Sequence, residues 1–309
     1  MSDFRLKVFL SVARNLNFTK ASKELFISQP AISKHIQELE NKYGITLFNR
    51  SGNKISLTQA GKLLVAHAED ITEKYRKLDF EMSRLAGNFT GELRIGASTT
   101  IAQYLLPPIL AKFMLAYPKI KISLISENSS RIEALLHNHE IDLGLVEGSS
   151  RCQDLRYVPF LKDELVLVGN TKGVYSGIDE VTLDEIKNLP LIFRENGSGT
   201  LAVIEKTLER YNIRLNDLNI VTQIGSTEGI KKFIMHSDCL AILSVIAITD
   251  ELLSNRLRIV DTEELSFERE FAFVSRHGTV PETAEQFMDL ARSHNPKFSS
   301  KNKYVFSAL

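Results

Sequence analysis

The sequence predicts three parts: an N-terminal winged helix-turn-helix of α+β type, one long linker helix, and a C-terminal α/β region of two Rossmann-like subdomains. Three observations predict this architecture. Two helical segments joined by a tight turn come before residue 44. An apolar stripe with helical spacing follows over residues 64–85. Strand and helix patterns then alternate along most of the remaining 309-residue chain.

Composition is typical of a globular protein, with 43% hydrophobic and 25% charged residues. No run of apolar residues approaches the length of a membrane span, and the first ten residues lack the apolar segment of a secretory signal. We therefore expect a cytoplasmic protein without membrane contact. Cys152 and Cys239 match no metal-ligand spacing, so we expect no metal and no cofactor.

Charge is distributed unevenly along the chain. Residues 1–67 carry ten Lys/Arg and four Asp/Glu, which is a net charge of +6. Because the whole chain has 38 of each kind, the remainder carries −6. A basic head favours an anionic polymer as its partner, although chance asymmetry explains the charge alone equally well.

Helical periodicity and capping residues predict three helices in the head, at Asp3–Asn15, Lys20–Phe26 and Gln29–Tyr43. Thr19 is the predicted cap of the second helix and Ser28 that of the third, which Gly44 ends. Two short runs, residues 47–50 and 54–57, flank a turn-forming segment. They predict a hairpin that forms the wing.

The third helix carries the residues expected to read DNA, because the second helix of a helix-turn-helix enters the major groove. Gln can pair with adenine, and the Pro30 ring and Ala31 methyl can touch a thymine methyl. Candidate reading residues are Ser28, Gln29, Pro30, Ala31, Ser33, Lys34 and Gln37. Candidate phosphate contacts are Thr19, Lys20, Arg50 and Lys54. The alternative is an ordinary three-helix cap with solvated polar residues.

A regular apolar stripe marks the long helix, which Thr58 is expected to cap and which runs to about Ala86. The spacing alternates between four and three residues, as in a coiled-coil seam. A lone helix would leave the stripe in water, so we expect a partner helix in a dimer; the alternative is packing onto the chain's own body. The stripe consists of Leu64, Ala68, Ile71, Tyr75, Leu78, Met82 and Leu85.

Beyond a linker at residues 87–91, strands and helices alternate, which predicts two parallel-sheet subdomains in series. The predicted strands are Glu92–Ala97, Lys121–Ser126, Asp142–Val146, Arg156–Phe160, Glu164–Val168, Leu191–Arg194, Asn219–Ile224, Leu240–Leu243, Leu257–Val260 and Phe271–Ser275. The predicted helices are Thr100–Tyr117, Ser129–His139, Thr182–Asn188, Gly199–Tyr211, Thr227–His236, Val245–Leu253 and Glu282–His294.

Residues 18–40, 44–50 and 57–61 closely resemble the head of LysR-type transcriptional regulators. In length and element order the resemblance covers the whole chain. It implies a dimerising linker helix and an effector domain like a periplasmic binding protein, whose two subdomains are joined by two crossovers. We place these near residues 161–162 and 266–268. The expected domains are 1–58, 59–90 and 91–309, the last with subdomain I at 91–161 and 268–309 and subdomain II at 162–267.

In open α/β sheets, ligands bind past the carboxyl ends of strands, and helix N-termini with Ser or Thr hydroxyls suit an anion. The matching family positions bind small effectors, often carboxylates, and residues 194–200 look like the family's version. Plain helix capping is the alternative explanation. Candidate effector residues are Ser98, Thr99, Thr100, Asn128, Ser129, Glu147, Gly197, Ser198, Gly199, Thr200, Gln223, Ser226 and Thr227.

The resemblance implies a sequence-specific DNA-binding regulator, activator or repressor and not an enzyme, controlled by a small, anionic effector in the cleft between the subdomains. Expected partners are double-stranded promoter DNA, the effector, further copies of the chain as dimer or tetramer, and RNA polymerase. Two other classes stay open: a solute-binding or transferase-like α/β protein with an incidental helical head, and a nucleoid-type DNA binder without an effector. Salt-dependent DNA binding tests the first, and a ligand-induced thermal shift tests the second.

Overall fold

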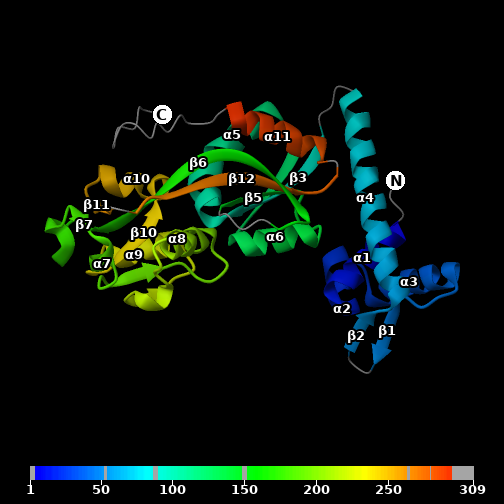
Figure 1. Ribbon diagram of the computed structural model, residues 1–309. Coiled ribbons are helices and arrows are strands. Elements are labelled where there is room, and N and C mark those ends of the chain that lie inside the picture. Colours follow the sequence, from blue (N-terminus) through cyan, green and yellow to red (C-terminus); the bar gives the residue numbers. More distant parts are fainter. Residues whose placement is uncertain are drawn as a thin grey trace. The chain divides into compact units, whose positions relative to one another are not determined.

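The structure is a computed structural model that describes residues 4–51, 54–85, 90–147, 152–262, 265–278 and 280–293 (Figure 1). It divides into two compact units, Met1–Thr90 and Gly91–Leu309. Among the described residues, no helix combines the length and the apolar character that crossing a membrane requires.

The N-terminal unit is a three-helix core with a hairpin and a long helix. Its elements are α1 (Phe4–Asn15), α2 (Phe18–Leu25), α3 (Gln29–Tyr43), β1 (Phe48–Ser51), β2 (Lys54–Leu57) and α4 (Gln59–Leu85). Phe9 of α1, Ile32 and Ile36 of α3 and Phe48 of β1 belong to one buried core, in which the ring centres of Phe9 and Phe48 lie 5.5 Å apart. β1 and β2 pair antiparallel, so the predicted wing is present.

Local capping chemistry explains where these helices begin and end. The Ser28 side chain accepts a hydrogen bond from the Ala31 N–H, and Gly44 ends α3 with a φ of 64°, so both predictions for α3 are confirmed. The predicted start of α2 is wrong. Asn17 caps α2 by accepting from the Lys20 N–H at 2.9 Å, which places Thr19 inside the first turn. α2 ends at Leu25 because Phe26 adopts a left-handed conformation.

The apolar stripe on α4 divides into two parts. Ala68 is fully buried and Leu64 packs against the same core, so the alternative of packing onto the chain's own body holds for these two positions. Tyr75 is half-buried, and the side chain of Leu85 lies outside the described residues. The positions that stay exposed are Ile71, Leu78 and Met82. Thr58 caps the helix as predicted, since its Oγ1 accepts from the Gly61 N–H at 3.0 Å.

The C-terminal unit contains two subdomains. Subdomain I comprises β3 (Gly91–Ser98), the π-helical turn η1 (Ile101–Leu105), α5 (Leu106–Ala116), β4 (Ile120–Glu127), α6 (Ser129–His137), β5 (Leu143–Glu147) and α11 (Glu282–Ser293). Subdomain II comprises η2 (Val174–Gly177), β7 (Glu180–Val181), α7 (Leu183–Ile186), β8 (Leu191–Phe193), α8 (Gly199–Glu209), η3 (Leu215–Asp217), β9 (Ile220–Gln223), α9 (Thr227–Ile234), β10 (Leu240–Ser244), α10 (Val245–Leu253) and β11 (Leu257–Thr262).

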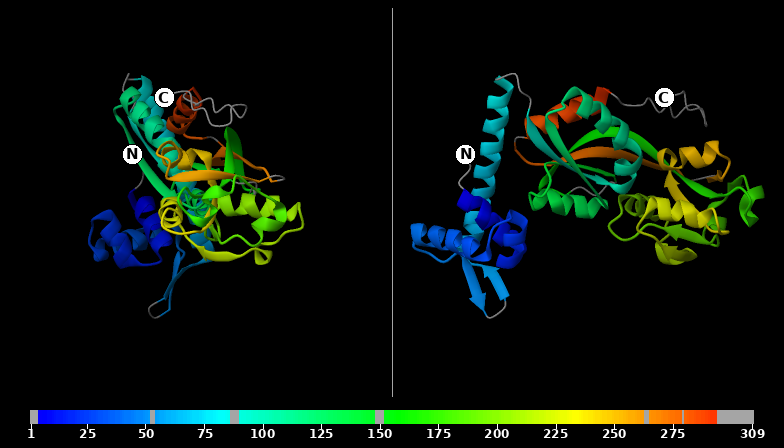
Figure 2. Two further views of the ribbon diagram at one scale, coloured as in Figure 1. Left: turned by 90° about the vertical axis from the view of Figure 1, so that its left-hand side faces the viewer. Right: turned by 180° about the vertical axis from the view of Figure 1, so that it is seen from behind.

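Two long strands, β6 (Leu155–Asn170) and β12 (Phe267–Arg276), run through both subdomains side by side (Figure 1; Figure 2 shows them from behind). They join two sets of parallel strands into one sheet of order β4-β3-β5-β12-β6-β10-β8-β9, with β11 also on β6. The prediction of separate strands at 156–160 and 164–168 is wrong, because β6 is continuous. The predicted crossovers at 161–162 and 266–268 therefore fall on paired strands, where Leu161 lies opposite Phe271.

Candidate DNA interface and effector site

The polar face of α3 is open to solvent. Ile32, Ile36 and Leu39 are buried in the head, which turns the opposite face of the helix outward. The exposed predicted residues are Ser28, Gln29, Pro30, Lys34 and Gln37, while Ala31 and Ser33 are half-buried. This face offers amide and hydroxyl groups, an ammonium group and two apolar surfaces, which is the chemistry that base edges and phosphates require.

Hydrogen bonds along α3 orient two of its amides. Gln29 Nε2 donates to Ser33 Oγ at 3.0 Å, and Gln37 Nε2 donates to Asn41 Oδ1 at 3.1 Å. Both bonds use the amide nitrogen as the donor. The amide oxygen takes no part in them and can accept from the amino group of an adenine.

The predicted phosphate contacts come from two elements. Thr19 and Lys20 are exposed in the first turn of α2. Arg50 and Lys54 lie on the paired strands of the wing, at positions one step apart in the β1–β2 register, and their side chains lie outside the described residues.

In subdomain I, two hydroxyls at the end of β3 have no hydrogen-bond partner. The Oγ of Ser98 and the Oγ1 of Thr99 are both buried and unpaired. Thr100 is buried at the start of η1. β3 runs parallel to β5 with Ala97 opposite Leu145, so Ser98 and Thr99 continue beside the last residues of β5, where Glu147 lies.

In subdomain II, the start of α8 lies directly on the end of β5. A Cβ added to Gly199 would lie 2.1 Å from the Glu147 carbonyl oxygen, so only glycine allows this approach. Thr200 Oγ1 donates to Glu147 Oε1 at 2.9 Å. The buried Oγ of Ser198 has no partner and makes no capping bond to α8. The predicted residues of the two subdomains are thereby brought together.

Other predicted effector residues already have structural roles. Asn128 caps α6 through the Arg131 N–H, and Ser226 caps α9 through the Gly229 N–H, as the capping alternative expects. Ser129 Oγ donates to the Glu147 carbonyl oxygen at 3.1 Å. The remaining positions are Gly197, which has a φ of 86° and accepts from the Ser130 N–H, Gln223, which is exposed, and Thr227, which is buried.

A buried arginine, which the sequence did not identify, joins these residues. Arg269 of β12 donates from Nε to Asp163 of β6 at 2.6 Å and from Nη1 to Thr200 Oγ1 at 2.8 Å, and its Nη1 lies 3.1 Å from Glu147 Oε2. Asp163 also accepts from Ser244 Oγ at 2.9 Å. All three charged side chains are at most 2% exposed. Burial raises the pKa of Asp163, while the charge of Arg269 and the hydrogen bonds from Arg269 and Ser244 act to lower it.

A second buried arginine, Arg194 at the end of β8, forms a bidentate pair with Glu195 at 2.8 and 3.0 Å. Its Nη1 donates to Thr227 Oγ1 at 3.1 Å. Glu195 also accepts a 3.4 Å hydrogen bond from Asn128 of subdomain I. Arg194 and Arg269 are therefore both paired with carboxylates. The sequence shows that the two residues are charged, but it does not show which residues pair with them.

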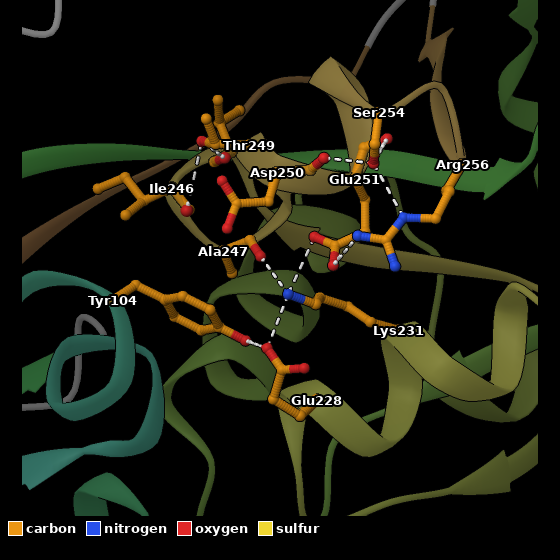
Figure 3. Close-up of polar contacts among 11 residues, drawn as sticks. Tyr104, Glu228, Lys231, Ile246, Ala247, Thr249, Asp250, Glu251, Ser254 and Arg256 are labelled. Atoms are coloured by element: carbon orange, nitrogen blue, oxygen red, sulfur yellow. Dashed lines mark hydrogen bonds and ion pairs between the residues drawn. The ribbon is translucent and has the colours of Figure 1, made fainter. Parts of the chain in front are cut away.

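A further polar cluster joins the subdomains at η1 and α9 (Figure 3). Tyr104 of η1 donates its hydroxyl to Glu228 Oε1 of α9. Lys231 Nζ lies 2.7 Å from Glu228 and 3.0 Å from Glu251 of α10, and donates to the Ala247 carbonyl oxygen at 2.8 Å. Within the described residues, no group of three His, Cys, Asp or Glu side chains is placed to hold a metal ion.

Comparison with known proteins accounts for both units. Residues 4–62 match the model of the bacterial regulatory helix-turn-helix protein, lysR family, and residues 86–296 match the LysR substrate binding domain. The chain is 29% identical over 269 residues to the HTH-type transcriptional regulator CysL of Bacillus subtilis, which covers 87% of this chain and 89% of CysL.

Two solved structures share the architecture. The regulatory domain of CcmR from Synechocystis PCC6803, in complex with 2-PG, is 26% identical with a TM-score of 0.61, covering 68% of this chain and 99% of that one. Full-length CbnR, complexed with its target DNA, is 20% identical with a TM-score of 0.61, covering 95% and 99%. The chain therefore belongs to the LysR family of DNA-binding transcriptional regulators, with an N-terminal helix-turn-helix and a C-terminal effector-binding domain.

Proposed function

We propose that this regulator reads a specific operator with the exposed face of α3 and responds to a small anion bound between its subdomains. We place the anion site at the neighbouring ends of β3 and β5, where the start of α8 contacts Glu147. The observation that carries the proposal is that Ser98, Thr99 and Ser198 each bury a hydroxyl without a hydrogen-bond partner. Leaving a buried hydroxyl unpaired costs free energy, which a ligand with acceptor atoms would recover.

The charge balance of the site supports an anion. The start of α8 has no side-chain cap, so its backbone N–H groups point toward this region with the positive end of the helix dipole. Glu147 and Asp163 both lie against the buried Arg269, whose positive charge offsets part of the negative charge that an anion meets. The 2-PG complex of the CcmR regulatory domain is consistent with a ligand in this kind of domain.

A dimer through α4 fits the DNA-reading part of the proposal. Ile71, Leu78 and Met82 form an exposed apolar row at coiled-coil spacing. Two heads held by paired helices would read a two-part, roughly palindromic promoter site. Thr19, Lys20, Arg50 and Lys54 remain our proposed phosphate contacts, which set the register of each head.

A thermal-shift experiment with 2-PG, inorganic phosphate and citrate tests the effector half of the proposal. A bound anion at 100 times its dissociation constant should stabilise the chain by about 2.7 kcal/mol. Ser198→Ala should not destabilise the free chain, because its buried hydroxyl has no protein partner, and should remove the ligand-induced shift.

Ser244→Ala is the matched control. It removes an equally buried hydroxyl that donates to Asp163, so it should cost about 1–3 kcal/mol of stability and retain the ligand-induced shift. The proposal fails if none of the three anions shifts the melting temperature, or if Ser198→Ala retains the full shift.

A further inference from the structure

The Tyr104–Glu228 hydrogen bond is a direct side-chain link between the two subdomains (Figure 3). Tyr104 lies in η1, which begins one residue after Thr100, and Glu228 lies in the first turn of α9, directly after Thr227. The link therefore connects two segments that each follow residues of the proposed effector site. The segment η1 is a π-helical turn, a distortion that is frequent at functional sites.

Lys231 fixes the carboxylate that receives this bond. Its side chain is only 4% exposed, and its ammonium group lies between the carboxylates of Glu228 and Glu251. The same group lies 4.9 Å from the centre of the Tyr104 ring, so it is attracted to the ring face as well. Charge and hydrogen bonding therefore hold Glu228 in one position against Tyr104.

The titration behaviour of both partners agrees with this geometry. Burial raises the pKa of Tyr104, and Glu228 raises it further. Burial alone would raise the pKa of Glu228, but hydrogen bonds from Lys231 and Tyr104 lower it below its usual value. Tyr104 is thus a neutral donor and Glu228 a charged acceptor at neutral pH, which is the stronger class of hydrogen bond.

The apolar contact between α10 and the core of subdomain I does not fix the subdomains as the Tyr104–Glu228 hydrogen bond does. Ile246 of α10 is half-buried and packs against the core of subdomain I. Such a contact is non-directional and permits sliding, whereas a hydrogen bond to a fixed carboxylate defines one relative position.

We propose that Tyr104 is a positioning residue for the effector site: through Glu228 it fixes the start of α9 against η1 and so, together with the Thr200–Glu147 and Asn128–Glu195 contacts, sets the separation of the two subdomains. The role of this separation in effector binding rests on the proposed function. The separation itself exists without a ligand, so it is measured in the free chain, and a failure to find a binding anion leaves that measurement unaffected.

The chain offers a matched control for this tyrosine. Tyr157 of β6 donates to Glu133 of α6 at 2.7 Å, and both residues lie within subdomain I. Burial and a glutamate raise the pKa of Tyr157 as they do for Tyr104. Tyr104→Phe and Tyr157→Phe therefore each remove a tyrosine-to-glutamate hydrogen bond, and Tyr157→Phe also removes the 3.0 Å bond that its hydroxyl accepts from the Cys152 N–H. Only the Tyr104 bond joins the subdomains.

Electron-spin distance measurement on the full chain tests the proposal. Nitroxides at Lys112→Cys on α5 and Lys206→Cys on α8, both exposed positions, report the separation once Cys152 and Cys239 are changed to Ser. Labelled chain is diluted with unlabelled chain, so that distances between copies do not contribute. We expect one narrow distance peak in the labelled chain without further substitutions and in Tyr157→Phe. In Tyr104→Phe we expect a broader distribution at longer distances to replace that peak.

Variants of Glu228 provide a second route if Tyr104→Phe folds poorly. Glu228→Ala removes the acceptor and should shift the distances as Tyr104→Phe does, whereas Glu228→Gln retains an acceptor oxygen and should restore the narrow peak. A narrow peak in both Tyr104→Phe and Glu228→Ala overturns the proposal. Equal broadening in Tyr157→Phe also overturns it, because the effect would then be a general loss of stability.

Discussion

On α3 the polar residues that we expect to read DNA are exposed, whereas the polar residues at the strand ends of the C-terminal unit are buried and largely bonded to one another. Gln29 and Lys34 meet water, while Glu147, Thr200 and Arg269 meet each other. A polymer that approaches from outside needs groups already at the surface. A small ligand that enters between subdomains needs groups that are positioned in advance and shielded from water.

The difference also separates two sources of stability. The exposed face of α3 can change with little effect on folding, because its side chains contact solvent. The buried network cannot, because each charge that loses its partner remains in a medium of low polarity. Substitutions in the two regions should therefore separate binding from folding.

The largest effect is expected from Arg269→Met. It leaves Asp163 and Glu147 buried without their shared cation, which should cost about 3–5 kcal/mol of C-terminal unit stability. Urea unfolding monitored in the full chain measures this loss. Arg256→Met is the control: Arg256 is half exposed and pairs with Glu251 at 3.4 Å, so its loss should cost about 0–1 kcal/mol. Equal losses in the two variants would refute the special role of the buried network.

Leu78→Asp should abolish self-association while each head remains folded. The substitution places a charge in the exposed apolar row of α4, where a partner helix would bury it. Sedimentation velocity measures the change. Leu63→Asp is the matched control, since Leu63 is exposed on the same helix but outside the row. An unchanged sedimentation profile in Leu78→Asp would rule out the α4 seam.

Gln29→Ala should weaken binding to an operator selected from random DNA by about 1–3 kcal/mol and leave binding to non-specific DNA unchanged. The reason is the loss of an amide that can pair with adenine. Lys34→Ala should instead weaken both kinds of binding and reduce the dependence on salt. Fluorescence anisotropy with both DNAs separates the two cases, and equal weakening by Gln29→Ala would exclude base reading by this residue.

The smallest effect concerns pH. Because the pKa of Glu228 is lowered in the folded chain, its contribution to stability is present above about 4.3, the ordinary pKa of a glutamate, and is lost as the pH falls through the lower folded value. In Glu228→Gln the melting temperature should therefore fall less steeply as the pH is lowered. Melting temperatures between about pH 3 and pH 6, a range that includes the ordinary pKa of a glutamate, measure this difference. An identical acid profile in both chains would contradict the lowered pKa.

Local chemistry made the N-terminal unit largely predictable. Ser28 and Gly44 act within a few residues of their own positions, so the bounds of α3 follow from the sequence. The start of α2 was missed because Asn17 and Thr19 are both good caps, and only the folded turn selects between them. The stripe on α4 has one spacing throughout, but contacts with the head separate Ala68 from Leu78.

The proposed effector site of the C-terminal unit was predictable only in part. Its position at strand ends follows from a rule for parallel sheets, and that rule led to Ser98 and Ser198, whose buried hydroxyls have no hydrogen-bond partner in the structure. Asp163 and Arg269 are 106 residues apart, and their pairing depends on the register of β6 and β12. No local pattern encodes that register, so the network that joins the subdomains required the structure.

The most direct test of the account is the affinity of the full chain for its selected operator, with and without the panel anion that gives the largest thermal shift. We expect wild type and Ser198→Ala to bind the operator equally without the anion, because α3 is unchanged. The anion should alter the affinity of wild type and leave that of Ser198→Ala as it was. An equal response in both chains, or no response in wild type, would contradict the claim that the buried hydroxyls receive the signal.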